Sequence, residues 1–155
     1  MRILRILVDA DACPVKHIII NVARKYNIPV VMFINTSHRI SDGYSKVVIA
    51  DKQRDSADLA LISQASVRDI VITQDYGVAI LAIGKGARAL NQNGLSYTID
   101  NIDRLIFESH LSQKIRYAEG RISGPQRRNR DDDVRFQNAL VNLIAEIEKS
   151  IENEA

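Results

Sequence analysis

Hydrophobic residues along the chain form two kinds of pattern, continuous apolar runs and apolar positions with helical spacing. The continuous runs are short and rich in β-branched residues, which predicts buried strands of a parallel sheet. They cover residues 3–8, 28–34, 46–50 and 70–73, and a further run at 95–99 could add a fifth strand. The sequence therefore predicts a sheet of four or five strands.

Helical spacing marks the segments between and after these runs. Pro14 fits the first turn of a helix that extends to Tyr26, because the N–H that proline lacks has no intrahelical partner at that position. Asp100 is the predicted N-cap of a later helix, with Asp103 three residues on, as in a capping box. The predicted helices cover residues 14–26, 55–65, 78–83, 100–117 and 136–151.

This alternation of strands and helices predicts the fold class, an α/β fold with a parallel sheet flanked by helices. The 155 residues fit one domain, with a core at about residues 1–100 and a C-terminal helical extension at about residues 101–155. We expect the last two helices to form an added layer. Hydrophobic residues make up 46% and charged residues 26%, a globular balance that argues against disorder.

Composition excludes several classes of protein. The single cysteine, Cys13, excludes an intramolecular disulfide framework and a cysteine-rich zinc site. No apolar run approaches the ~20 residues needed to span a bilayer, so we expect no membrane association. The N-terminal run is interrupted by Arg2 and Arg5 and lacks the pattern of a signal peptide, which favours a cytoplasmic location. The net charge of +2 does not by itself indicate a nucleic-acid partner, and the sequence leaves the oligomeric state open.

Acidic residues follow two of the predicted strands. Asp9 and Asp11 come after the first strand, Asp75 follows the fourth, and Asp55 and Asp58 open the helix between. Ligands of open α/β sheets bind at the carboxyl ends of strands, where neighbouring strands are about 4.8 Å apart. Carboxylates this close repel one another unless a cation compensates, and oxygen ligands suit Mg²⁺ or Mn²⁺. A single aspartate after a strand is usually a turn or cap residue, so the joint pattern carries the prediction of a shared metal site.

Three neighbours of these acids have more than one interpretation each. Cys13 could be a nucleophile at a helix N-terminus, although a small packing residue is the commoner role. Lys16 could bind a phosphate oxygen or be a solvated helix charge. Thr73 could contact substrate, hold Asp75 by a hydrogen bond, or simply fill a strand position.

A basic segment extends from Lys114 to Arg130. It contains six cations against one acid, a local charge of +5. Its last arginines, Arg127, Arg128 and Arg130, are suited to bidentate phosphate contacts, although three aspartates follow at once and a solvated loop is the alternative. The chain has only eight aromatic residues and no tryptophan, which argues against an extended base-stacking platform.

The nine residues from Val8 to Lys16, Val-Asp-Ala-Asp-Ala-Cys-Pro-Val-Lys, resemble the opening signature of the YaiI/YqxD family of small bacterial proteins. The resemblance covers nearly the whole chain. It includes residues 55–58, 71–75 and 101–102, the Gly-Pro pair at 124–125, and Asp132 and Phe136. The chain departs from the family at residues 76–79, which read Tyr-Gly-Val-Ala where Pro-Leu-Ala is more common, and at 122–125, where a second glycine is usual.

The resemblance implies a PIN-like nuclease fold, in which acids at strand ends hold a divalent metal for phosphodiester cleavage. It implies that Asp9, Asp58 and Asp75 face the metal, with Asp11 and Asp55 as further candidates. The corresponding hypothesis is a phosphodiesterase or ribonuclease that uses Mg²⁺ or Mn²⁺ and acts on RNA or another nucleic acid.

Two other functions remain open at this point. One is a nucleotide- or RNA-binding module that has kept the acidic fold without turnover. The other is a phosphatase of the haloacid dehalogenase type, since Asp9-x-Asp11 after a strand matches its nucleophile motif. That chemistry also needs a downstream lysine and a paired acid, roles that Thr73 and Asp75 match only loosely. Metal-dependent cleavage would identify the nuclease, and a covalent phosphate on Asp9 would identify the phosphatase.

Overall fold

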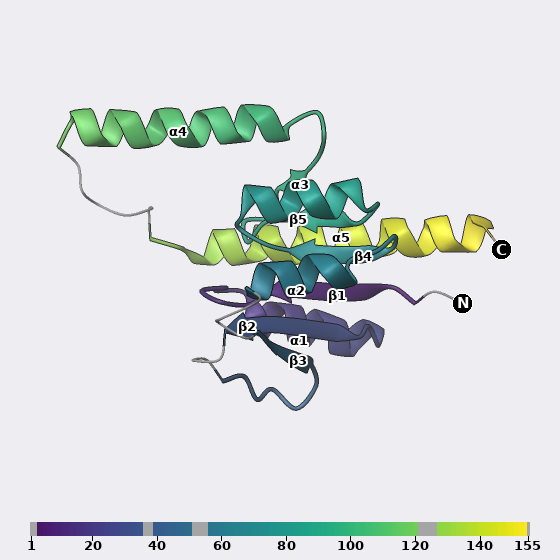
Figure 1. Cartoon of the computed structure of the whole chain (residues 1–155). Helices are drawn as coiled ribbons and strands as arrows, with labels where there is room; N and C mark the ends of the chain where they lie inside the picture. The colour runs from purple at the N-terminus through teal and green to yellow at the C-terminus, as the bar shows by residue number, and fades with distance from the viewer. Residues whose placement is uncertain (1–2, 36–38, 51–55, 121–126, 155) are drawn as a thin grey trace.

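The computed structural model describes residues 3–35, 39–50, 56–120 and 127–154 of the chain. In this part of the chain a six-stranded sheet lies between two layers of helices (Figure 1). The strand order is β3-β2-β1-β4-β5-β6, so the chain moves outward from β1 on one side and then returns to the other side with β4. The strands are β1 Arg5–Asp9, β2 Val30–Asn35, β3 Lys46–Ala50, β4 Asp69–Ile72, β5 Arg88–Leu90 and β6 Ser96–Tyr97.

The first five strands are parallel, and only β6 pairs antiparallel, with β5. This confirms the predicted α/β fold, whose mostly parallel sheet has the PIN-like arrangement. The run at 95–99 forms a strand of only two residues, at positions 96–97. Strand β5 was not predicted, because its three residues are too few to form a recognisable apolar run.

Each face of the sheet packs against its own helices. Helices α1 (Lys16–Tyr26) and α5 (Arg130–Glu154) cover one face, and α2 (Ala57–Gln64) and α3 (Tyr76–Gly84) cover the other. Successive strand residues point to opposite faces, so Ile6 and Val8 of β1 join the first core cluster while Leu7 joins the second. Central strands buried on both faces give the continuous apolar runs seen in the sequence.

The two C-terminal helices differ in how they pack. Helix α5 is part of the core layer beside α1 and contributes five buried residues, Phe136, Leu140, Leu143, Ile144 and Ile147. The predicted apolar stripe is therefore confirmed, but α5 completes a layer of the domain instead of adding one. Helix α4 (Ile102–Ala118) buries only Ile102 and extends away from the sheet (Figure 1).

Two predicted helix starts differ from the structure. The N-cap of α4 is Asn101, not Asp100, because Asn101 and Thr98 exchange hydrogen bonds: the Asn101 Oδ1 accepts from Thr98 N at 2.9 Å, and the Thr98 Oγ1 accepts from Asn101 N at 3.1 Å. Helix α1 begins at Lys16, just after Pro14. Among the helices that the structure describes, none is both long and apolar enough to cross a membrane.

Candidate active site

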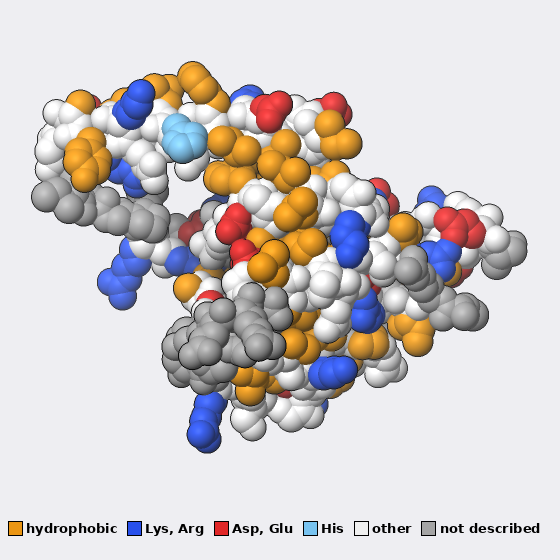
Figure 2. Space-filling view, viewed as in Figure 1, with side chains coloured by type: hydrophobic (Ala, Val, Ile, Leu, Met, Phe, Trp, Pro, Cys, Tyr) orange, Lys and Arg blue, Asp and Glu red, His pale blue; other side chains and the backbone are white. Residues whose placement is uncertain are grey.

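The carboxyl ends of β1 and β4 meet at the point where the strand order reverses. Strand β1 has β2 on one side and β4 on the other, and Val8 pairs with Ile72 in the parallel register. The next residues along the two strands are Asp9 and Thr73, which therefore lie beside each other. Such a switch point is where open α/β sheets bind their ligands. Figure 2 shows several acidic side chains close together at this edge of the sheet.

Thr73 connects the two strand ends through its hydroxyl group. The Thr73 Oγ1 donates to Asp9 Oδ2 at 3.0 Å and accepts from the backbone N–H of Asp75 at 3.0 Å. Thr73 is 2% exposed, and its hydroxyl holds the two acids in place. The expected hydrogen bond between Thr73 and Asp75 is confirmed. Burial raises the pKa of Tyr97 to about 12, so its hydroxyl stays protonated, and it donates to the Thr73 carbonyl at 3.3 Å.

Asp75 is the N-cap of α3, and this role fixes one of its two oxygens. The Asp75 Oδ1 accepts from Gly77 N at 2.7 Å and from Val78 N at 3.3 Å. A Cβ atom at Gly77 would lie 3.1 Å from that oxygen, a tight contact. No donor among the described residues reaches Asp75 Oδ2, so the cap leaves that oxygen available to a ligand.

Asp9 is the electrostatic centre of this edge. Burial raises the pKa of the Asp9 carboxyl above its usual value, and the hydrogen bond from Thr73 offsets part of this rise. The negative charges of three nearby carboxylates raise the Asp9 pKa further: Asp58, Asp75 and Asp11. The structure therefore brings the other three predicted site aspartates that it describes close enough for each to act on Asp9.

Asp11 and Asp58 have local partners of their own. The Asp11 Oδ2 accepts from the backbone N–H of Asn35 at 3.2 Å and from its side-chain Nδ2 at 2.7 Å. These bonds tie the turn after β1 to the end of β2. Asp58 lies in the first turn of α2, where its Oδ1 accepts from Leu59 N at 3.0 Å. Asp55, the fifth predicted acid, lies outside the described residues.

The acids fit a divalent cation in charge and donor type, but they do not form a closed ligand shell. Within the described residues, no three His, Cys, Asp or Glu side chains stand close enough to hold one ion as they are. A small hollow of about 20 Å³ lies between Asp9, Asp11 and Thr73, which is room for about one ion or one water. The expected single coordination shell of Asp9, Asp58 and Asp75 is therefore not preformed. Like charges without a cation stay apart, and each carboxylate takes hydrogen bonds from its own surroundings.

Cys13 and Lys16 are on the turn and helix that follow Asp11. Burial raises the pKa of the Cys13 thiol, which disfavours the thiolate that a nucleophile requires, and Cys13 packs against the core beside α1. The structure thus favours the packing role. The Lys16 ammonium donates to the carbonyl of Ala10 at 3.2 Å, so it lies against the turn that carries Asp9 and Asp11.

The predicted arginine contacts divide into two kinds. The guanidinium of Arg128 donates to Asp133 Oδ1 at 2.6 Å, to Asn93 Oδ1 at 2.8 Å and to the Gln92 carbonyl at 2.7 Å. These three bonds fasten the start of α5 to the turn between β5 and β6. Arg127 and Arg130 are exposed instead. The six cations of the basic segment also include Arg121, which lies outside the described residues.

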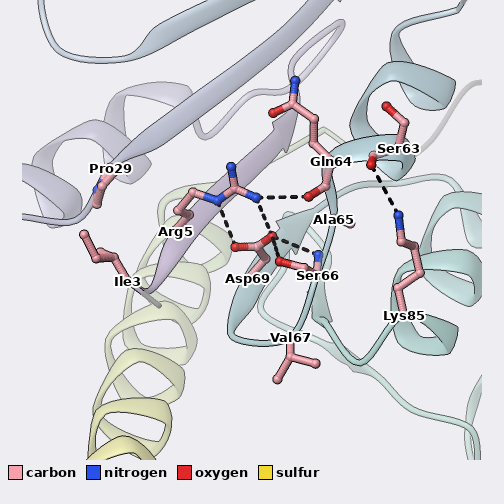
Figure 3. A pocket seen from close by; sticks show the side chains of 10 residues that line it. All are labelled: Ile3, Arg5, Pro29, Ser63, Gln64, Ala65, Ser66, Val67, Asp69 and Lys85. Carbon is pink, nitrogen blue, oxygen red and sulfur yellow. Dashed lines mark hydrogen bonds and ion pairs between the residues drawn. The ribbon is translucent and has the colours of Figure 1, made fainter. Parts of the chain in front are cut away.

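A hollow of about 900 Å³ lies at the opposite, amino edge of the sheet. Its charged groups are used by the fold itself (Figure 3). Arg5 donates to both oxygens of Asp69 at 3.1 and 2.8 Å and to the Gln64 carbonyl at 3.0 Å. Lys85 donates to the Ile62 carbonyl at the end of α2 at 2.5 Å. The charged side chains of this hollow therefore hold the fold together and are not free to react with a ligand.

Asn35 was not anticipated from the sequence, although it orients Asp11. Asn35 is the last residue of β2. A polar residue at the end of a strand was the sequence feature that could have identified it. Strand β2 neighbours β1, so the same strand-end argument that selected the aspartates extends to it.

Comparisons with known proteins agree with the signature residues. A family model described as "Uncharacterized BCR, YaiI/YqxD family" matches residues 7–146. A UPF0178 protein of Ruminiclostridium cellulolyticum is 57% identical over 141 residues, which cover 91% of this chain and 92% of that protein. A UPF0178 protein of Alkaliphilus oremlandii is 45% identical over 143 residues, which cover 92% of each chain. A UPF0178 protein of Clostridium tetani is 44% identical over 146 residues, which cover 94% of this chain and all of that protein. No solved structure matches the chain. Both the family model and these relatives span most of the sequence, and the chain belongs to the YaiI/YqxD family.

Proposed function

We propose that the protein is a phosphodiesterase that depends on a divalent metal and acts on nucleic acid, RNA in particular. The observation that carries this proposal is the position of Asp9. It lies partly buried at the switch point of the sheet and is surrounded by the charges of Asp11, Asp58 and Asp75. An uncompensated cluster of carboxylates at a ligand-binding edge is the arrangement that a divalent cation would complete.

Asp9, Asp58 and Asp75 are the residues that would hold Mg²⁺ or Mn²⁺. When bound, such an ion supplies a water of lowered pKa and offsets the charge that develops on the phosphate. One oxygen of each acid is already oriented by a donor of this chain: Thr73 for Asp9, Leu59 for Asp58 and Gly77 for Asp75. The other oxygens are the ones that would face the ion.

The remaining site residues act on orientation and on the substrate. Asp11 holds the turn after β1 against Asn35, so we assign it a positioning role. Lys16 lies against the same turn and would bind a phosphate oxygen. The exposed side chains of Arg127 and Arg130 would contact phosphates farther along the strand, whereas Arg128 is held by Asp133 and the turn at residues 92–93.

The phosphatase alternative receives less support. Besides Asp9 as nucleophile it requires a downstream lysine and a paired acid, roles that Thr73 and Asp75 match only loosely. The Thr73 hydroxyl is already engaged by Asp9 and by the backbone N–H of Asp75. The binding-module alternative is favoured by the open ligand set, since three acids do not close around one point in the described residues.

Cleavage of labelled single-stranded RNA and DNA with Mg²⁺, Mn²⁺ or chelator tests the proposal. We expect cleavage with metal, none with chelator, and none by Asp75→Asn, because the amide keeps the shape of the side chain but loses the charge. Asp103→Asn, an exposed first-turn acid of α4, is the matched control and should cleave like the wild type. Robust cleavage by purified Asp75→Asn would contradict the mechanism. No cleavage by the wild type would favour the binding module.

A further inference from the structure

A second hollow lies beside the acidic edge, and three of its nine lining residues are cations. It has a volume of about 470 Å³ and lies between α1, along its length from Lys16 to Arg24, and the segment between β2 and β3. Helix α1 contributes Lys16, His17 and Arg24, and the segment contributes Arg39 and Asp42. We call this hollow the α1 cleft. None of its residues other than Lys16 was singled out by the sequence pattern.

The charges of the α1 cleft are suited to an anion. Asp42 is its only lining acid among the described residues, and its carboxylate is already taken by the next turn: Ser45 N donates to it at 2.7 Å and Tyr44 N at 2.8 Å. Lys16, Arg24 and Arg39 still outnumber this one acid, so the cleft has an excess of positive charge. Clustered cations of this kind bind phosphate groups.

Arg24 is held in a fixed orientation. Its Nη2 donates to the Asp42 carbonyl at 2.9 Å, and its guanidinium lies 5.1 Å from the centre of the Tyr44 ring. A guanidinium that is already ordered loses less entropy when it binds a ligand. The lining also includes Ile20 and Ile40, which give the cleft an apolar portion against which a sugar can pack.

Lys16 links the α1 cleft to the acidic edge. It lines the cleft, and its ammonium donates to the carbonyl of Ala10, the residue between Asp9 and Asp11. A chain with a phosphate at the acids can therefore place its adjacent phosphate in the cleft without leaving the surface of the protein. A mononucleotide would fill only one of the two places.

We propose that the α1 cleft binds the phosphodiester backbone of a single-stranded nucleic acid on one side of the bond at the acidic edge. This rests on the proposed function, because the acidic edge is taken as the reaction site. The ligand is recognised through phosphate charge and sugar packing, so the cleft itself selects strand polarity and length instead of base sequence.

Binding of a labelled single-stranded RNA oligonucleotide in chelator, without turnover, tests the cleft separately from catalysis. Arg39→Ser removes an exposed cation of the cleft and should weaken binding about tenfold, the value of one charge-assisted hydrogen bond. It should also lower the salt slope by about 0.7, the contribution of one neutralised phosphate on a single strand. Lys25→Ser, on the same helix but outside the cleft lining, is the charge-matched control and should bind like the wild type.

Equal weakening by both variants would show a general charge effect and would overturn the proposal, as would an unchanged affinity in Arg39→Ser. Adenosine monophosphate and inorganic phosphate serve as competitors. Unlabelled oligonucleotide is the reference competitor. If adenosine monophosphate or inorganic phosphate displaces the labelled oligonucleotide at the same concentration as this reference does, the cleft binds a free phosphate compound and the proposal of a bound strand fails.

Discussion

Two aspartates at opposite edges of the same sheet have opposite electrostatic surroundings. At the amino edge, the carboxylate of Asp69 is 2% exposed and pairs with both guanidinium donors of Arg5. At the carboxyl edge, the Asp9 side chain accepts a hydrogen bond from Thr73 and has three other acids around it among the described residues. The fold compensates the buried carboxylate of Asp69 with a cation, whereas the half-buried Asp9 lies among like charges.

This difference separates a structural charge from a candidate functional one. An ion pair such as that of Asp69 fixes the start of β4 against β1 and offers nothing to a ligand. A set of carboxylates that raises the pKa of its own central member costs stability, and such clusters occur where a ligand provides the compensating charge. The hollow of about 900 Å³ at the amino edge is lined by such structural contacts, so hollow size alone does not identify the candidate site.

The largest change in stability is expected at the amino edge. Arg5→Ala leaves the buried Asp69 carboxylate with only the donors of Ser66, and removing one partner of a buried pair costs about 3 kcal/mol. For a domain of this size that lowers the Tm by about 6–12 °C. Arg88→Ala is the control, because its pair with Glu146 is exposed and contributes at most about 1 kcal/mol. Thermal unfolding of both variants measures the contrast, and equal shifts would contradict it.

A smaller effect, on activity, is expected from Asp11→Asn. The amide cannot accept from Asn35 as strongly as the carboxylate does, so the turn that carries Asp9 is held less firmly. Loss of such an outer contact usually lowers activity about 10–100-fold. The measurement is kcat for RNA cleavage, with Asn35→Ala expected to give a similar loss. If Asp11→Asn abolished cleavage as completely as Asp75→Asn, Asp11 would hold the metal directly.

The smallest effect is a gain of stability at the carboxyl edge. The pKa of Asp9 is higher in the folded state than its ordinary value of 3.8. Protonated Asp9 therefore stabilises the fold fully at pH values below 3.8. This stabilisation is lost as the pH rises through the folded-state pKa. At pH 7 without metal, Asp9→Asn should therefore raise the Tm by about 2–4 °C, the effect of about 1 kcal/mol.

Two comparisons sharpen this test of Asp9. At pH values well below 3.8, Asp9 is protonated in both states, so the difference in Tm between Asp9→Asn and the wild type should disappear. Adding Mn²⁺ at pH 7 should raise the Tm of the wild type and leave that of Asp9→Asn unchanged. A lower Tm for Asp9→Asn at pH 7 without metal would show that its carboxylate stabilises the fold, contrary to this account.

Much of the fold was predictable because the central strands are buried on both faces. Such strands read as continuous apolar runs, and the long stripe of α5 reads equally clearly. Strand β5 could not be predicted, because it has three residues and depends on its neighbours β4 and β6. The local pattern also could not predict which layer α5 joins. An apolar stripe shows that a helix packs against something, but not which face of the sheet it covers.

The site residues that could be predicted are those that directly follow a predicted strand. The acids after β1 and β4 were identified because parallel strand ends meet at one edge of the sheet. The partners of Arg128 were not, because Gln92 and Asn93 are distant in sequence and come near only in the folded chain. The α1 cleft was missed for the same reason, since its two walls come from segments that each look like ordinary surface.

The most direct test of the account is the structure of a crystal soaked in Mn²⁺, with the anomalous signal used to locate the ion. The account predicts a peak at the carboxyl edge, with oxygens of Asp9 and Asp75 drawn in to about 2.1 Å from the ion. Asp75→Asn crystals soaked in the same way should lose the peak. A wild-type crystal whose ordered Mn²⁺ ions all lie elsewhere, with Asp9 and Asp75 unmoved, would contradict the central claim.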